Sequence, residues 1–140
     1  MILRARALIA ESGWLVAADE TVTTVADARR VVAERSAQVI NIKLMKAGVA
    51  EALEIAAVAK GAGLALMIGG NVESILAMTV SACFAAGQGG FTFADLDTPM
   101  FLASNPFDGG YALNGGRISL AHIAAGHGVS PKEYKNDAAG

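Results

Sequence analysis

The sequence has few of the features that indicate a secreted, membrane-spanning or highly charged protein. Its single cysteine, Cys83, cannot form an internal disulfide, and it lies among small apolar residues, so we expect a buried thiol in a reduced, cytoplasmic protein. No apolar run approaches the roughly 18 residues of a membrane helix. Arg4 and Arg6 precede no continuous apolar stretch, so we expect no signal peptide.

Charged residues are scarce as well. Lys, Arg, Asp and Glu make up 17% of the 140 residues, the formal net charge is −2, and the sequence pI is about 5.6. A nucleic-acid-binding domain usually carries a basic patch or stripe. The one adjacent basic pair, Arg29 and Arg30, lies near Asp27 and Glu34 in a helical pattern. We therefore expect neither a nucleic acid nor a membrane as partner.

Apolar residues, in contrast, are in excess. They make up 54% of the chain, and the mean hydropathy is +0.45. Ordinary soluble domains contain roughly 45–50% apolar and about 25% charged residues. A chain that is this apolar for its size is expected to bury surface against something outside itself.

Apolar runs alternate with helical patterns along most of the chain. The runs predict buried strands at 14–18, 38–44 and 64–68 and a shorter extended segment at 91–94. Predicted helices span 3–12, 25–36, 49–60 and 73–86, the second capped by Thr23 or Thr24. Farther on, the predicted elements are a hairpin of 111–113 with 117–120 and a loose polar tail at 130–140. The pattern indicates an α/β fold with a parallel sheet.

Polar or glycine residues follow each predicted strand. They are Asp19 after the first strand, Lys43 after the second, Gly69 and Gly70 after the third, and Asp95 and Asp97 after the fourth. Since the carboxyl ends of parallel strands share one edge, we expect these residues to lie together. A carboxylate beside a lysine suits a hard metal ion together with a general acid/base.

Taken singly, each of these residues also has an ordinary explanation. A charge that ends a strand is often solvated, and Gly69-Gly70 can be a plain turn or can let a substrate approach the backbone. Alternate residues of an extended segment, such as Asp95 and Asp97, face the same side in any protein. An unrelated flavodoxin-like sheet is another possible fold for this pattern. His122 and His127 have no spaced partner that would indicate a zinc site.

Four segments taken together resemble one family. Ala18–Thr21, Asn41–Lys46, Met67–Ser74 and Asp95–Pro99 are similar, in order and spacing, to the last strands of the muconate-lactonising/mandelate racemase branch of the enolase superfamily. The similarity is greatest to the C-terminal part of dipeptide (L-Ala-D/L-Glu) epimerases. It implies a partial (β/α)₈ TIM barrel over residues 1–129, of about the last three to four βα units with a C-terminal hairpin or irregular extension, and a flexible tail at 130–140.

The resemblance also implies roles for single residues. Asp19 matches the third carboxylate ligand of the family's Mg²⁺, and Lys43 matches one of two lysines that act as general acid and base on opposite faces of the substrate's α-carbon. Asp95 and Asp97 match the acidic pair that receives the ammonium group of a dipeptide. Glu73 matches a glutamate near the substrate in related members.

The sequence departs from the family pattern in what precedes Asp19. The family's first acid/base lysine, its first two metal ligands and its capping domain have no counterpart here. We therefore expect an enzyme fragment that is inactive alone, in which Mg²⁺ binding is weak or absent. The alternative is a non-catalytic, homo-oligomeric half-barrel domain derived from such an enzyme. Either way we expect a partner, which is a complementing barrel half or a second copy of the chain.

Overall fold

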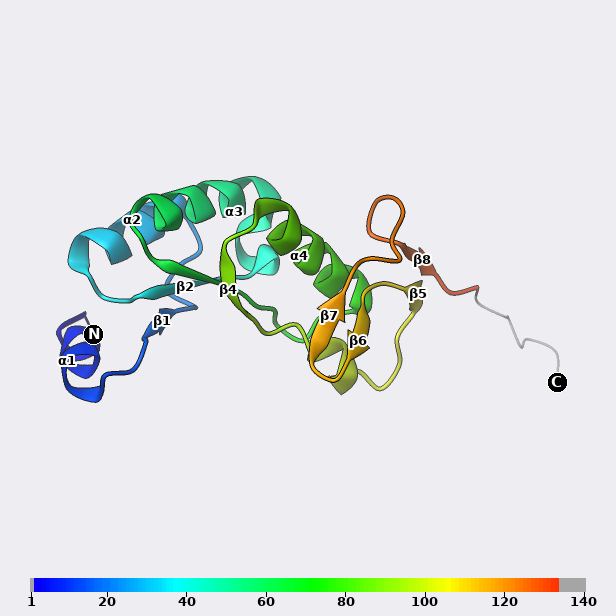
Figure 1. The fold of residues 1–140 in the computed structure, drawn as a ribbon, viewed down its shortest axis with the longest axis horizontal. Helices are drawn as coiled ribbons and strands as arrows, with labels where there is room; N and C mark the ends of the chain where they lie inside the picture. Colours follow the sequence, from blue (N-terminus) through cyan, green and yellow to red (C-terminus); the bar gives the residue numbers. More distant parts are fainter. Residues whose placement is uncertain (1, 134–140) are drawn as a thin grey trace.

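A computed structural model describes residues 2–133 and contains a four-stranded parallel sheet in the order β1-β2-β3-β4 (Figure 1). The strands are β1 (Ala17–Ala18), β2 (Val39–Ile42), β3 (Ala65–Ile68) and β4 (Phe91–Ala94). The helices are α1 (Ile2–Ser12), α2 (Val25–Glu34), α3 (Leu44–Gly61) and α4 (Ile75–Gln88). The predicted α/β class and the parallel sheet are thus confirmed.

The order of the strands decides between the two folds considered from the sequence. Consecutive strands are neighbours, and right-handed crossovers then place the connecting helices on the same face of the sheet. Figure 1 shows α2, α3 and α4 together on one side of the strands. A flavodoxin-like sheet would instead reverse its strand order and carry helices on both faces. The flavodoxin-like alternative is therefore wrong.

Alternation along β2 separates the core from the opposite face of the sheet. Ile40 and Ile42 belong to the buried core, which they share with residues of α3 such as Ile55. Asn41 and Lys43 alternate with them, so they point to the face that the helices leave uncovered. Both are nevertheless buried, at 4% and 9% exposure. The polar side chains of Asn41 and Lys43 therefore lie on the face of the sheet that points away from the helices.

The first strand differs from its prediction. We expected a buried strand over 14–18, but β1 contains only Ala17 and Ala18, and Trp14 and Leu15 are 78% and 60% exposed. The reason is the position of β1 at the edge of the sheet, where it pairs with β2 alone among the described residues. The apolar run is present, but no other part of residues 2–133 covers its beginning.

The third helix begins earlier than predicted, at Leu44 rather than Val49. Its first turn is separated from the remainder by Gly48, whose φ of 71° and ψ of 170° are not helical. The predicted cap of α2 is confirmed for Thr24, whose side chain accepts a hydrogen bond from the backbone N–H of Asp27. Across residues 2–133, none of the helices combines the length and the apolar character that a membrane crossing requires.

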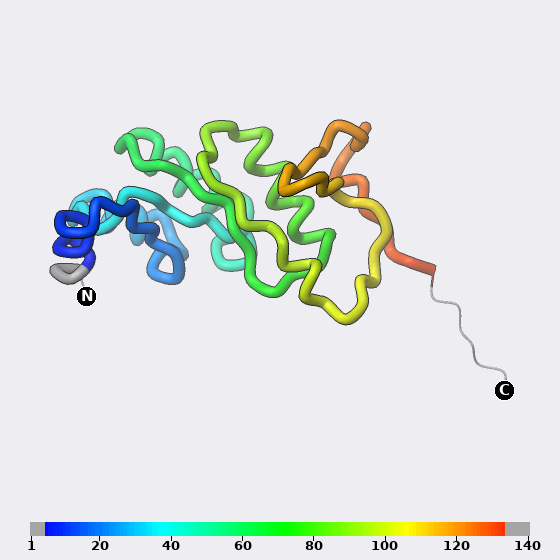
Figure 2. The backbone as a smooth tube through the Cα atoms, turned by 60° about the horizontal axis from the view of Figure 1, so that its bottom comes forward, coloured from blue at the N-terminus to red at the C-terminus, as the bar shows by residue number. Residues whose placement is uncertain are grey.

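After β4 the chain forms a 3₁₀ turn, η1 (Thr98–Phe101), and then two small antiparallel sheets, which we call the C-terminal extension (residues 105–131). Strand β5 (Phe107–Gly109) pairs with β8 (Val129–Pro131), and β6 (Ala112–Asn114) pairs with β7 (Arg117–Ser119). The predicted hairpin is confirmed as β6–β7. Ser130 and Pro131 were assigned to the tail but belong to β8; residues 134–140 lie outside the described part. Figure 2 shows the extension beside α4, far from α1.

Candidate active site at the carboxyl edge of the sheet

Lys43 follows β2 directly and is the best-connected side chain of this edge. Its side chain is 10% exposed. The Nζ atom donates a hydrogen bond to Oε1 of Glu20 at 2.7 Å and lies 3.1 Å from Oδ2 of Asp19. Oδ1 of Asn71 accepts a third bond at 3.3 Å. The structure thus brings together two of the predicted site residues, Asp19 and Lys43.

A second lysine takes part in the same cluster. Nζ of Lys46 donates to the backbone oxygen of Asp19 at 2.6 Å and to its Oδ1 at 2.9 Å, and the side chain is 9% exposed. The sequence pattern predicted no role for Lys46 or for Glu20. Two signals could have found them. Lys46 stands three residues after Lys43, which places both on one side of a helical turn, and Glu20 is adjacent to Asp19.

We call Asp19, Glu20, Lys43 and Lys46 the ion cluster, and its charges shift the pKa values inside it. Burial alone would raise the pKa of Asp19, but hydrogen bonds and charges from Lys46 and Lys43 outweigh it, so the pKa lies below its ordinary value. Burial alone would lower the pKa of Lys43, but Glu20 and Asp19 raise it above its ordinary value. Glu20 and Asp19 therefore stabilise the ammonium form of Lys43.

Asp95 and Asp97, the acidic pair, lie at the end of β4 and differ from the ion cluster. The backbone N–H of Asp95 donates to the oxygen of Ile68 at 2.9 Å, which extends the pairing with β3. Both aspartates are exposed, while Leu96 between them is only 3% exposed. Burial and the nearby Asp97 raise the pKa of Asp95, and the more distant charge of Lys43 opposes this rise. The pair thus presents two unneutralised carboxylates at the same edge.

The predicted substrate-binding glycines have clear packing reasons. A Cβ on Gly69 would lie 2.7 Å from Oδ1 of Asn41, and a Cβ on Gly70 would lie 2.5 Å from the side chain of Met78 in α4. Glu73 lies next to them, and its Oε1 accepts the backbone N–H of Asn71 at 2.8 Å. Packing and the local turn therefore account for all three residues here, and a substrate contact stays a prediction.

The described residues do not form a magnesium site by themselves. Both carboxylate oxygens of Asp19 are already engaged by lysine ammonium groups. Within residues 2–133, no group of three or more His, Cys, Asp or Glu side chains is arranged to hold a metal ion. Mg²⁺ requires near-octahedral oxygen coordination, usually with more than one carboxylate or with bound phosphates. The residues present do not fit the ion without further ligands.

Known proteins with similar sequences are dipeptide epimerases. The chain is 60% identical over 121 residues to the "Aromatic dipeptide epimerase" of Herpetosiphon aurantiacus, covering 86% of this chain and 34% of that protein. It is 44% identical over 109 residues to the "L-Ala-D/L-Glu epimerase" of Thermotoga maritima, covering 78% and 32%. The chain therefore spans about a third of the length of the curated relatives it matches.

Solved structures agree with the sequence comparison. A mandelate racemase/muconate lactonizing protein from Herpetosiphon aurantiacus superimposes with a TM-score of 0.89 and 55% identity, over 95% of this chain and 38% of that one. A dipeptide epimerase from Enterococcus faecalis, solved with Mg and L-Leu-L-Tyr, gives a TM-score of 0.75 and 38% identity, over 83% and 33%. A model of the family described as enolase C-terminal domain-like matches residues 2–135. The chain belongs to this enolase C-terminal domain-like family.

Proposed function

We propose that this chain forms the C-terminal wall of a dipeptide epimerase-type active site, inside a (β/α)₈ barrel whose other strands lie outside this sequence. One observation carries the proposal. The nearly buried ammonium of Lys43 and the exposed carboxylates of Asp95 and Asp97 follow strands of the same parallel sheet at the same edge. A proton carrier and a receptor for a cationic group are thus available to one substrate.

The chemistry follows from the charges. The carboxylates of Asp95 and Asp97 attract the ammonium group of a dipeptide, and Lys43 exchanges a proton with the α-carbon on one face. Because Glu20 and Asp19 raise the pKa of Lys43, the residue is an ammonium at neutral pH in this arrangement, and it releases its proton less readily than an ordinary lysine. To act as the base it must lose part of the support from Asp19 and Glu20. The proton on the opposite face requires a second group from outside this chain.

In this proposal Asp19 contributes to a magnesium site only where further oxygen ligands come from outside the sequence. A divalent ion stabilises negative charge that develops on a substrate carboxylate. The ion pairs of Asp19 with two lysines already hold its carboxylate at the carboxyl edge of the sheet. Added Mg²⁺ is therefore expected to leave the melting temperature of the isolated chain unchanged, which calorimetry measures.

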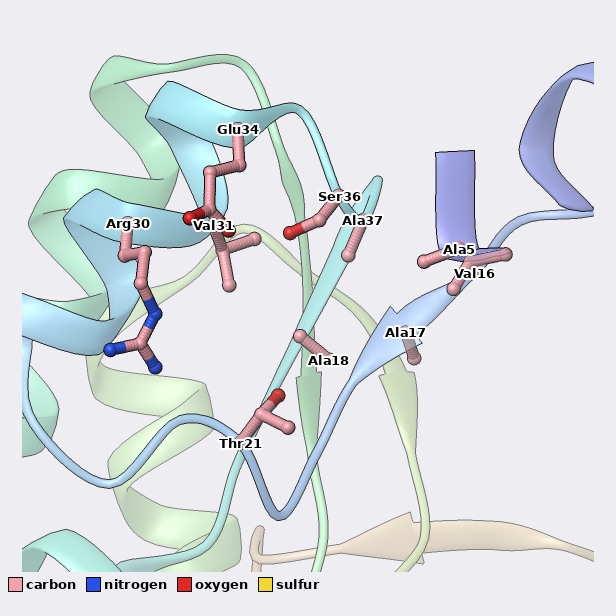
Figure 3. A pocket seen from close by; sticks show the side chains of 10 residues that line it. All are labelled: Ala5, Val16, Ala17, Ala18, Thr21, Arg30, Val31, Glu34, Ser36 and Ala37. Carbon is pink, nitrogen blue, oxygen red and sulfur yellow. The ribbon is translucent and has the colours of Figure 1, made fainter. Parts of the chain in front are cut away.

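The open edge at β1 supports a partner that completes the barrel. Figure 3 shows the pocket beside this strand, which Ala17 and Ala18 line together with Val31 of α2 and Ala5 of α1. The cavity measures about 310 Å³ and is lined mainly by apolar atoms. Strand edges with unpaired backbone groups tend to add another strand. We propose that the preceding part of an enolase-type barrel pairs with the open edge of β1. The alternative is a homo-oligomer of this chain, which light scattering tests.

A chimera tests the proposed function. The chain replaces the matching third of the Herpetosiphon aurantiacus aromatic dipeptide epimerase, and epimerisation of an aromatic dipeptide is followed by NMR. We expect the chimera to be active and Lys43→Met to lower kcat by about 10²–10⁴-fold, the usual contribution of a general acid/base. Lys60→Met is the matched control, because its Nζ binds the backbone oxygen of Gln88, which ends α4 away from this edge.

Two results would contradict the proposal. One is a folded chimera, with the circular dichroism of the parent enzyme, that does not epimerise the dipeptide. The other is full activity in Lys43→Met. A stable homodimer of the isolated chain that no barrel fragment displaces would favour the non-catalytic domain instead.

A further inference from the structure

Tyr111 links the C-terminal extension to the acidic pair. Its hydroxyl donates a hydrogen bond to the backbone oxygen of Leu96 at 2.5 Å. That oxygen belongs to the peptide that joins Leu96 to Asp97, and the peptide is planar. A bond to this group therefore fixes the direction in which the chain leaves Leu96. Since the N–H of Asp95 is held by Ile68, the segment is fixed on both sides of Leu96.

Tyr111 is itself fastened to the rigid part of the fold. Its backbone N–H donates to Oγ1 of Thr79 at 3.1 Å, and Thr79 is a fully buried residue of α4. The preceding residue, Gly110, donates its N–H to Gly128 at 3.0 Å, and its oxygen accepts from Nε2 of His122 at 2.9 Å. Three hydrogen bonds thus hold the backbone of Gly110 and Tyr111, and the bond to Thr79 ties the phenol's position to α4.

The close packing at Gly110 adds a second constraint. This glycine has a φ of +90°, and a Cβ there would lie 2.6 Å from Cγ1 of Ile75 and 2.7 Å from Oγ1 of Thr79. A larger residue would push the extension away from α4 and move the phenol with it. Gly110 lies in the link between β5 and β6, and the close approach of its backbone to α4 therefore helps to place Tyr111.

Tyr111 also lines one cavity together with the acidic pair. The cavity measures about 240 Å³, and its other wall includes Leu113 and Ile118 of the β6–β7 hairpin. The extension and the carboxylates therefore line one open cavity at the end of β4.

We propose that Tyr111 is a positioning residue that holds Asp95 and Asp97 as a close pair, so that the C-terminal extension is a part of the site. That the pair receives an ammonium group rests on the function proposed above, whereas the positioning does not. A tyrosine that only filled space would contribute through its ring. The positioning role depends on its hydroxyl, so the two can be separated.

The first experiment compares Tyr111→Phe with the wild-type chain by NMR titration of ¹³C-labelled aspartate carboxyl groups. Phenylalanine keeps the ring and loses the hydroxyl. We expect the two carboxylates to separate, so that the raised pKa of Asp95 falls by about half a pH unit or more toward the ordinary carboxyl value. Ile118→Val is the matched control, because it thins the same cavity wall without touching the hydroxyl bond, and its Asp95 titration should equal the wild type.

An unchanged Asp95 titration in Tyr111→Phe overturns the proposal, and so does an equal fall in Ile118→Val. A second variant covers the case in which Tyr111→Phe does not fold. In this variant, 3,5-difluorotyrosine replaces tyrosine at position 111. The analogue has nearly the same shape, and its neutral phenol allows the chain to fold. Its hydroxyl ionises at lower pH than that of tyrosine and then cannot donate a hydrogen bond to Leu96. The carboxyl signals of Asp95 and Asp97 should shift as this phenol ionises, and signals that do not respond contradict the positioning role.

The chimera adds a readout that separates this inference from the proposed function. There, Tyr111→Phe should raise KM for the dipeptide at least tenfold with little change in kcat, the reverse of Lys43→Met. An inactive chimera contradicts only the proposed function. The carboxyl titration in the isolated chain still tests whether Tyr111 positions the acidic pair. An active chimera in which Tyr111→Phe shifts the Asp95 titration but leaves KM unchanged contradicts the ammonium-binding role of the pair, and the positioning stands.

Discussion

The two ends of the functional edge are built in opposite ways. Near β1 and β2, the ion cluster brings two lysines against two carboxylates, with contacts of 2.7–3.1 Å between its closest charged atoms. Near β4, the acidic pair has two like charges and a raised Asp95 pKa. The cluster neutralises itself, whereas the pair does not.

This difference separates a preassembled part of the site from a part that requires a ligand. A compensated cluster needs no substrate to hold its geometry, because each ammonium is satisfied by carboxylate or backbone oxygens. An uncompensated pair costs stability that a bound cation can recover. In the proposed function, the Lys43 side would therefore hold its geometry before substrate arrives but would have to loosen its ion pairs to transfer a proton, whereas the Asp95 side would gain stability from a bound cation.

The largest effect is expected from Asp19→Asn. The change leaves the nearly buried ammonium groups of Lys43 and Lys46 without their shared charge, and hydrogen bonds to charged groups contribute about 1.5–3 kcal/mol. Because the Asp19 side chain is 38% exposed, we expect a loss of about 2 kcal/mol in unfolding free energy, measured by urea denaturation. Asp108→Asn is the control, since its contact with Lys132 is long and exposed. Equal losses in both variants would remove the distinction between the cluster and ordinary surface pairs.

A smaller loss is expected from Lys46→Met. Methionine keeps most of the apolar stem, and Asp19 remains paired with Lys43, so we expect about 1 kcal/mol in the same urea assay. The double variant Asp19→Asn/Lys46→Met should lose less unfolding free energy than the sum of the two single losses, because both substitutions remove the same interaction. Strict additivity would mean that the two residues do not act as one cluster.

An effect of opposite sign is expected from Asp95→Asn at neutral pH. Removing one of two neighbouring carboxylates relieves their repulsion and should stabilise the chain by about 0.5 kcal/mol, the scale of exposed charge pairs. Thermal unfolding at pH 7 measures it. Destabilisation would show that the pair is held together by contacts that outweigh its charge.

The pH dependence should separate the two ends in the same way. Asp19 has a lowered pKa, so its stabilisation is present above its unfolded value of 3.8 and is lost as pH falls through the folded pKa. Asp95 has a raised pKa, so its penalty appears as pH rises through the folded pKa and is absent in acid. The advantage of Asp95→Asn should therefore vanish as pH falls through the raised pKa of Asp95, because its carboxylate is then protonated. Urea denaturation from pH 3 to 7 follows it, and a constant advantage would contradict this cause.

The sequence predicted most of the fold because its signals were local. Continuous apolar runs located β2 and β3, and the turn signal at Asn114-Gly115-Gly116 located the β6–β7 hairpin. Burial at the sheet edge was not predictable in this way. Trp14 has the same apolar character as a core residue, but its exposure depends on which neighbours lie beyond β1.

Within the site, the strand-end residues were predicted and their partners were not. Asp19 and Lys43 stand at positions that a parallel sheet brings to one edge, so their proximity followed from the repeat. The contacts of Lys46 depend on the direction of the first turn of α3, and the contact of Tyr111 depends on how the extension folds back. Sequence spacing places Lys46 on the same side as Lys43, but it gives neither the contact of Lys46 with Asp19 nor the path by which the extension folds back.

The non-helical Gly48 has a consequence for how this site can vary. It separates the turn that carries Lys46 from the body of α3, and no atom lies within 4 Å of the position that a Cβ would take. The glycine is therefore required by its backbone angle alone. Because it interrupts the helical backbone, the turn that carries Lys46 is directed by its own contacts with Asp19 and not by continuation of the helix axis. A larger residue at position 48 is therefore expected to disturb the ion cluster through the backbone, although its Cβ would meet no atom within 4 Å.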